Sequence, residues 1–92
     1  MSHVTVRIPE PLRRYAGGAE QLHVNGGTLA DIIRALGERH PQLVPRLLAP
    51  EGNLRPYVNV FIGEDNARDL QGLGTVVPDG AEVVILPAVA GG

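Results

Sequence analysis

The 92-residue sequence has no cysteine, no tryptophan and no lysine, and its only serine is Ser2. The lack of cysteine excludes disulfides, thiolate metal sites, iron–sulfur clusters and a cysteine nucleophile. A serine so close to the N-terminus is expected to be frayed, which makes it a poor nucleophile. Any covalent chemistry must therefore use other groups of the chain.

The sequence also lacks long apolar runs and a strong charge of either sign. No stretch approaches the roughly 20 apolar residues of a membrane helix, and the N-terminal residues do not form a secretory signal. We therefore expect a cytoplasmic protein without a membrane partner. A formal net charge of -2 argues against nucleic-acid binding by bulk electrostatics. With 43% hydrophobic residues, residues 1–92 are predicted to form a single domain.

An internal catalytic centre is a third feature that the sequence lacks. The candidate residues of the types that a catalytic centre or a phosphate site would use are His3, His23, His40, Glu64, Asp65, Asp69, Gly26 and Gly27. The histidines lack metal-ligand spacing, and the carboxylates fall in a predicted turn, where they usually serve solubility. The glycine pair lacks the lysine of a P-loop and the spacing of a dinucleotide fingerprint. We expect no catalytic residue, metal or bound cofactor, and hence no enzyme.

Period-two and β-branched segments predict four strands and one short edge strand. The strands cover residues 4–8, 22–24, 57–62 and 82–86, and the edge strand covers 67–70. Gly63 to Asn66 and Asp79-Gly80 are predicted turns. Between Pro41 and Pro56, four prolines indicate an ordered loop with one short turn at 43–48.

One amphipathic helix is the clearest predicted element. Thr28 is its expected N-cap, with Asp31 in an acidic variant of the capping box. The apolar positions that follow have helical spacing and are Leu29, Ile32, Ile33 and Leu36. Pro41 ends the helix.

These elements predict an α+β domain in which one main helix packs on one face of a sheet. Residues 83–86 are apolar at every position, which is typical of a strand buried on both sides. A single helix covers only one of those sides. Either something outside the chain covers the second face, or loops of the chain screen it.

The sequence ends in Gly91 and Gly92, directly after the apolar segment 83–90. Glycines have no Cβ, so we expect a slim, flexible tail that can enter a narrow channel in another protein. The alternative is an inert, glycine-rich end. Because a carboxylate is unreactive toward weak nucleophiles, its use would require a separate enzyme that adenylates it with ATP. The missing lysines would then spare the activated end from attack by the chain itself, although a GC-rich genome explains them equally well.

The chain resembles the MoaD/ThiS-type, ubiquitin-like sulfur carriers. The resemblance rests on residues 79–92, on Val58-Asn59 in the third strand and on the helix start at Thr28-Leu29. Residues 55–60, the pair Glu64-Asp65 with Arg68 after it, and residues 85–92 are most similar to the carriers of cysteine biosynthesis. Because the cysteine and molybdopterin branches share the last residues, the tail identifies the family better than the pathway.

The resemblance implies a β-grasp fold with a mixed sheet and a C-terminal sulfur site. An E1-like enzyme would adenylate Gly92 with ATP, and sulfur would then convert the acyl adenylate to a thiocarboxylate. The tail residues Val89, Ala90 and Gly91 would thread the partner's active site. The expected acceptor is a pyridoxal-phosphate-dependent cysteine synthase homologue, with a metallopeptidase releasing the cysteine. In the molybdopterin branch the partner would be the large subunit of molybdopterin synthase.

The family also implies an apolar partner-binding face. Leu86 and Ile62 match its hydrophobic contact positions, and Phe61 or the register of Val58 and Val60 could take that role if a bulge shifts the strand.

Three other functions remain open from the sequence. The first is the small subunit of molybdopterin synthase, and the second is a ubiquitin-like modifier joined through Gly92 to lysines of target proteins. The third is an interaction domain with an inert tail.

Overall fold

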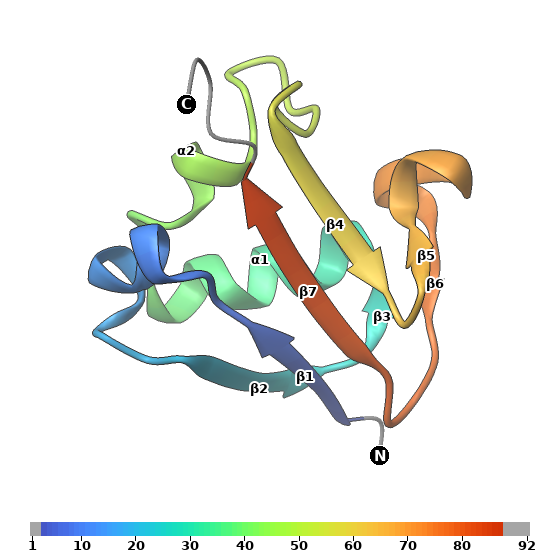
Figure 1. Cartoon of the computed structure of the whole chain (residues 1–92), viewed down its shortest axis with the longest axis horizontal. Helices are drawn as coiled ribbons and strands as arrows, with labels where there is room; N and C mark the ends of the chain where they lie inside the picture. The colour runs from blue at the N-terminus through green and yellow to red at the C-terminus, as the bar shows by residue number, and fades with distance from the viewer. Residues whose placement is uncertain (1–2, 88–92) are drawn as a thin grey trace.

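A computed structural model describes residues 3–87 of the chain, and its centre is a five-stranded mixed sheet in the order β2-β1-β7-β4-β5. The strands are β1 (His3–Arg7), β2 (Gln21–Asn25), β4 (Val58–Ile62), β5 (Asp65–Asn66) and β7 (Glu82–Pro87). Strands β1 and β7 are parallel, and the other neighbours are antiparallel. In Figure 1 the sheet faces the viewer and the helix α1 (Leu29–Arg39) crosses behind it. The predicted α+β architecture, with one main helix on one face, is confirmed.

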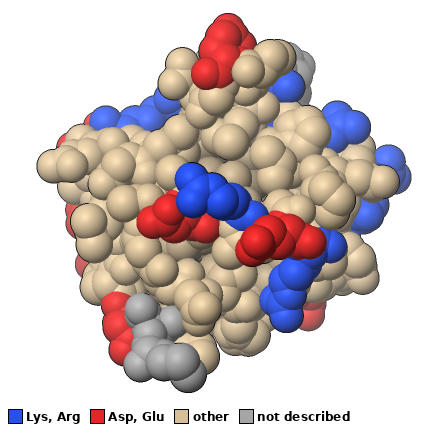
Figure 2. Space-filling view, turned by 180° about the vertical axis from the view of Figure 1, so that it is seen from behind, with Lys and Arg blue, Asp and Glu red and all other residues tan. Residues whose placement is uncertain are grey.

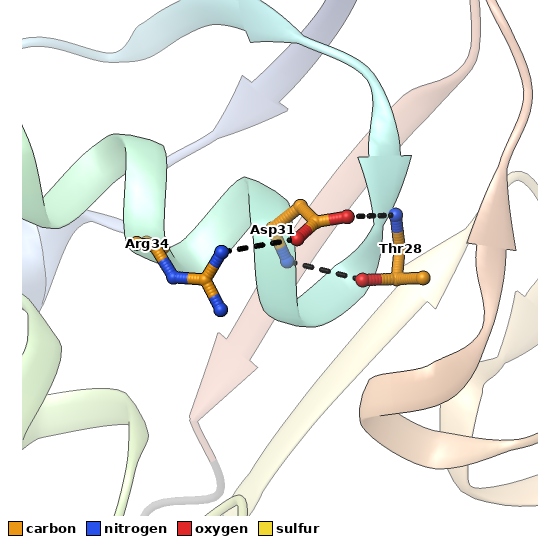
Figure 3. Close-up of polar contacts among 3 residues, drawn as sticks. All are labelled: Thr28, Asp31 and Arg34. Atoms are coloured by element: carbon orange, nitrogen blue, oxygen red, sulfur yellow. Dashed lines mark hydrogen bonds and ion pairs between the residues drawn. The ribbon is translucent and has the colours of Figure 1, made fainter.

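Helix α1 begins with the capping box that the sequence predicts. The Asp31 N–H donates to Thr28 Oγ1 at 3.2 Å, and the Thr28 N–H donates back to Asp31 Oδ2 at 3.0 Å (Figure 3). Arg34 Nη1 donates to the other carboxylate oxygen, Oδ1, at 3.2 Å. The hydrogen bonds from Thr28, with a smaller contribution from Arg34, lower the pKa of Asp31. The helix start is therefore fixed by local chemistry that the sequence shows directly.

The core lies between α1 and the facing side of the sheet. The four apolar positions predicted for the helix stripe are all buried. On the sheet side, alternate residues of the three central strands are buried, namely Val4, Val6, Val58, Val60, Ile62, Val83 and Ile85. Because side chains alternate along a strand, the residues between them point to the opposite face.

The segment 41–56 contains the short helix α2 (Val44–Leu47), within the turn predicted at 43–48. Leu43 and Leu47 are fully buried and anchor this segment to the core. Gly37 of α1 lies so close to Val44 that a Cβ there would be 2.6 Å from Val44 Cγ2. The proline-rich connector is therefore packed against α1.

The predicted edge strand at 67–70 is wrong. Those residues begin with the 3₁₀ helix η2 (Ala67–Asp69), which starts because the Asn66 side chain accepts a hydrogen bond from the Arg68 N–H at 3.0 Å. The edge strand is β5 instead, within the predicted turn, and its two residues pair with the end of β4. A side-chain cap therefore outweighed the weak strand preference of 67–70.

Four short elements have no counterpart in the prediction. They are the 3₁₀ helices η1 (Glu10–Ala16) and η3 (Gly72–Gly74), and the paired strands β3 (Gly27–Thr28) and β6 (Val76–Val77). Helix η1 starts after Pro9 and buries Leu12 and Ala16, so it closes the core beside the end of β1.

Candidate functional site at the open sheet face and the tail

The face of the sheet turned away from α1 carries an apolar strip. The strand pairing places Phe61 opposite Val84 and Asn59 opposite Leu86 on β4 and β7. Phe61 and Val84 are half-buried, whereas Leu86 is 47% exposed. This face corresponds to the side nearest the viewer in Figure 1, where no described helix lies over β7. We call Phe61, Val84 and Leu86 the apolar strip.

An ion pair borders the apolar strip on the β1 side. Arg7 Nε donates to Glu82 Oε2 at 2.6 Å across the parallel β1–β7 pair. The hydrogen bond to Glu82, and then the Glu82 charge, raise the pKa of Arg7, so the guanidinium remains charged. Both side chains are about half exposed, and such surface pairs add little stability. The pair therefore acts as a polar rim for the apolar strip.

The structure places the two predicted contact residues on opposite faces of the sheet. Leu86 lies on the open face, as expected. The expected placement of Ile62 on that face is wrong, because Ile62 pairs with Val83 and points with it into the core at 8% exposure. Phe61, the stated alternative, takes the open position without a bulge. Within 57–62, the alternation that buries Val58 and Val60 could have identified Phe61, whereas Val84 is assigned to the open face only by its pairing with Phe61.

A groove opens beside the strip because β1 leaves the sheet early. In the β1–β7 register Arg7 lies opposite Val84, so the next backbone donor toward β7 would be residue 9. Pro9 has no N–H, and the ladder ends there. The groove has a volume of about 550 Å³ and is lined by residues that include Arg7, Pro9, Arg13, Gln21, Val84 and Leu86. Through this groove, side chains of a partner protein can reach the last residues of β7.

Strand β7 ends at Pro87, which pairs with Val58 at the start of β4. The predicted sulfur-carrying residue Gly92 and the predicted threading residues Val89, Ala90 and Gly91 lie outside the described residues. Their roles stay predictions. The structure shows where the tail starts, namely at the end of the sheet where the groove opens.

Within residues 3–87, the groups that could support catalysis are scattered. No three histidines or carboxylates in this range lie close enough to hold a metal ion. His23 shares a 3.3 Å hydrogen bond with the Thr5 hydroxyl, and the His3 backbone N–H donates to Asp79. Every buried polar side-chain atom of the described part has a hydrogen-bond partner. None of the helices in residues 3–87 has the length and apolar character needed to cross a membrane.

The sequence and the fold are similar to known proteins over nearly their whole length. The ThiS family model matches residues 6–92. The sulfur carrier protein CysO of Mycobacterium tuberculosis H37Rv is 39% identical over 92 residues, covering 98% of this chain and 99% of CysO.

Solved structures are also similar to this chain, both in fold and in sequence. The CysO structure in the Amycolatopsis orientalis BexX/CysO complex has a TM-score of 0.90 and 39% identity, covering 97% of this chain and 99% of that chain. SAMP1 of Haloferax volcanii has a TM-score of 0.82 and 27% identity, covering 98% and 99% of the two chains. The predicted β-grasp fold is confirmed.

Proposed function

The chain belongs to the ThiS family, and on that premise we propose that it is a sulfur carrier protein whose Gly92 carboxylate is converted to a thiocarboxylate. The observation that carries this proposal is the near full-length identity to the sulfur carrier CysO. A strand that ends beside an open apolar strip, with five residues after it, provides the geometry that such a carrier needs.

The proposed chemistry has two steps, both catalysed by a separate E1-like enzyme. First, a Gly92 carboxylate oxygen attacks the α-phosphorus of ATP, and pyrophosphate leaves. A sulfur donor at the sulfide level then attacks the acyl carbon of the adenylate, and AMP leaves. The carrier contributes its terminal carboxylate and a docking surface, and it supplies no catalytic group. ATP binds to the partner, and we place the reaction in the cytoplasm, where ATP is available.

We assign the sulfur to cysteine biosynthesis, because the full-length relatives include CysO proteins. The proposed acceptor is an aminoacrylate on a pyridoxal-phosphate-dependent cysteine synthase homologue, and a metallopeptidase would then release cysteine and regenerate the carrier. A thiocarboxylate suits this use because it is anionic and nucleophilic at neutral pH but stays attached to a protein. The complex of a CysO with BexX supports recognition of such carriers by separate partner proteins.

A mass measurement tests the proposal. Incubation with the cognate adenylating enzyme, ATP and a sulfur donor is expected to raise the intact mass by about 16 Da, from replacement of oxygen by sulfur. The matched control omits ATP. An unchanged mass with an enzyme that is active on another carrier would contradict the proposal and favour an inert tail.

A protein modifier is the second candidate function, favoured by the likeness to the small archaeal modifier proteins. In that case Gly92 would form isopeptide bonds with lysines of target proteins. Target peptides in which a lysine is joined to the C-terminal segment of this chain would support it; after tryptic cleavage at Arg68, residues 69–92 would remain on the lysine. Stable, stoichiometric co-purification of this chain with a large catalytic subunit would instead indicate that it is the small subunit of molybdopterin synthase.

A further inference from the structure

Several arginines that have no carboxylate partner among residues 3–87 gather at the end of the molecule where the tail begins. The ion pairs among residues 3–87 join Arg7 to Glu82, Arg13 to Glu20 and Arg34 to Asp31. The arginines that lie within 4 Å of no carboxylate in the described range are Arg14, Arg39, Arg46, Arg55 and Arg68. Arginine is always charged at neutral pH, and no carboxylate of the described residues neutralises these five charges by direct pairing.

Four of these arginines line two hollows that both include Tyr15. Arg46 and Arg55 line a hollow of about 460 Å³ together with Tyr15, Gln42 and Pro45. Arg14 and Arg39 line a second hollow, of about 200 Å³, which Tyr15 and Gln42 also line. The described residues that line the two hollows include no aspartate and no glutamate. We call Arg14, Arg39, Arg46 and Arg55 with Tyr15 the arginine face.

Internal contacts hold the arginine face in place. The Arg46 guanidinium lies 4.3 Å from the centre of the Tyr15 ring, a cation–π contact. Arg55 Nε donates to the Pro45 carbonyl at 2.7 Å, and Arg39 Nη1 donates to the His23 carbonyl at 3.2 Å. Each guanidinium has five N–H groups. The described contacts of Arg39, Arg46 and Arg55 use only a part of these donors, so these side chains are held in place but can still bind an anion.

The arginine face lies next to the origin of the tail. Val58, the strand partner of Pro87, donates its N–H to the Arg55 carbonyl at 3.0 Å. In Figure 1 the arrow of β7 points toward the end of the molecule where α2, which carries Arg46, lies, and in Figure 2 basic groups line the side of the molecule that contains η1 and α2. Five residues follow Pro87, and a fully extended chain of that length spans at most ~18 Å.

This short reach constrains any enzyme that acts on Gly92. Its active site must lie within that distance of Pro87, so the rim around its tail channel must approach the end of the molecule that carries the arginine face. The opposite end of β7 carries carboxylates: Glu64 and Asp65 follow β4, and Asp79 precedes β7. Charge of opposite sign at the two ends of one strand orients an approaching partner.

We propose that the arginine face binds a surface rich in aspartate and glutamate on the enzyme that takes up the tail. This inference rests on the proposed function and names the chemistry of its partner. Both hollows are open, and Arg14 and Arg46 are exposed. Such a site is built to be covered by another protein surface, whereas a site for a free small anion would enclose its ligand.

The test compares two charge reversals of equal size. In Arg46→Glu the arginine face loses a cation and gains an anion, and Arg34→Glu makes the same change on α1, away from the tail. Binding of each variant to the adenylating enzyme is measured without ATP, at low and at high salt. We expect Arg46→Glu to weaken binding by about tenfold at low salt, with a smaller loss at high salt because ions screen the interaction. Arg34→Glu should bind within about twofold of the unmodified chain.

Kinetics separate this inference from the proposed function. In thiocarboxylate formation, Arg46→Glu should raise KM for the carrier and leave kcat nearly unchanged, since the reacting carboxylate is intact. Equal binding and equal KM for both variants would overturn the inference while the mass gain of the unmodified chain still supports the function. A second result would also overturn the inference: the isolated carrier binds inorganic phosphate, Arg46→Glu abolishes that binding, and the binding of the enzyme is unchanged. Circular dichroism of both variants controls for folding.

Discussion

At the scale of single residues, neighbouring apolar positions differ in what their side chains face. Val83 and Ile85 are buried, and Val84 and Leu86 point to the open side of the same strand. The sequence of 83–86 shows only that all four are apolar. The assignment of each residue to one face depends on the antiparallel pairing with β4, which a run of uniform apolar character does not reveal.

Leu86→Asp is expected to weaken binding to the partner enzyme and to leave the fold nearly intact. Leu86 is 47% exposed on the apolar strip, so a carboxylate there is hydrated in the free protein and desolvated in the complex. Titration calorimetry with the enzyme and a thermal melt measure the two effects. Global unfolding of Leu86→Asp would show that this side chain belongs to the core.

Ile62→Ala provides the matched control on the other face. Ile62 is buried on the side of the sheet that faces α1. Its truncation should therefore lower the free energy of unfolding by about 2–5 kcal/mol. Its binding to the enzyme, measured below the melting temperature, should be unchanged.

At the scale of elements, local chemistry decided which predictions succeeded. The start of α1 is correct to the residue because the Thr28 and Asp31 side chains each accept a hydrogen bond from the other's backbone N–H, within one turn. The prediction placed the edge strand at 67–70 and a turn where β5 lies, because the decisive contacts are the Asn66 cap and the pairing with β4. The pair β3 and β6 joins residues about fifty positions apart, and two-residue strands have no periodicity to read.

The helix start also predicts a pH dependence. The pKa of Asp31 in the folded protein is lowered from its ordinary value of 3.8, so its stabilising effect is complete above that value and is lost as the pH falls through the folded pKa. Asp31→Ala should therefore be less stable than the unmodified chain at pH 7, and the difference should shrink below about pH 4. Urea denaturation at a series of pH values measures it. A constant difference down to pH 2 would show that the Asp31 charge is not involved.

At the scale of the whole molecule, the site combines features that the sequence shows to different degrees. The glycine tail and the uncovered sheet face follow from residues 83–92 and from the presence of a single long helix. The arginine face was not predicted, because its arginines come from η1, α1, α2 and the segment before β4. Only the fold brings these four segments to one end of the molecule. The sequence shows that all of its basic residues are arginines, but not which of them lie close together.

Removal of Gly91 and Gly92 should separate docking from chemistry. The described core lies within residues 4–85, so the shortened chain is expected to melt at nearly the same temperature. It keeps the apolar strip and the arginine face, and it should still bind the adenylating enzyme, although more weakly because the tail contacts are lost. The truncated chain should show no gain of about 16 Da and should inhibit thiocarboxylation of the full-length carrier competitively. If it neither binds nor inhibits, then the tail alone supplies the recognition and both docking surfaces lose their proposed role.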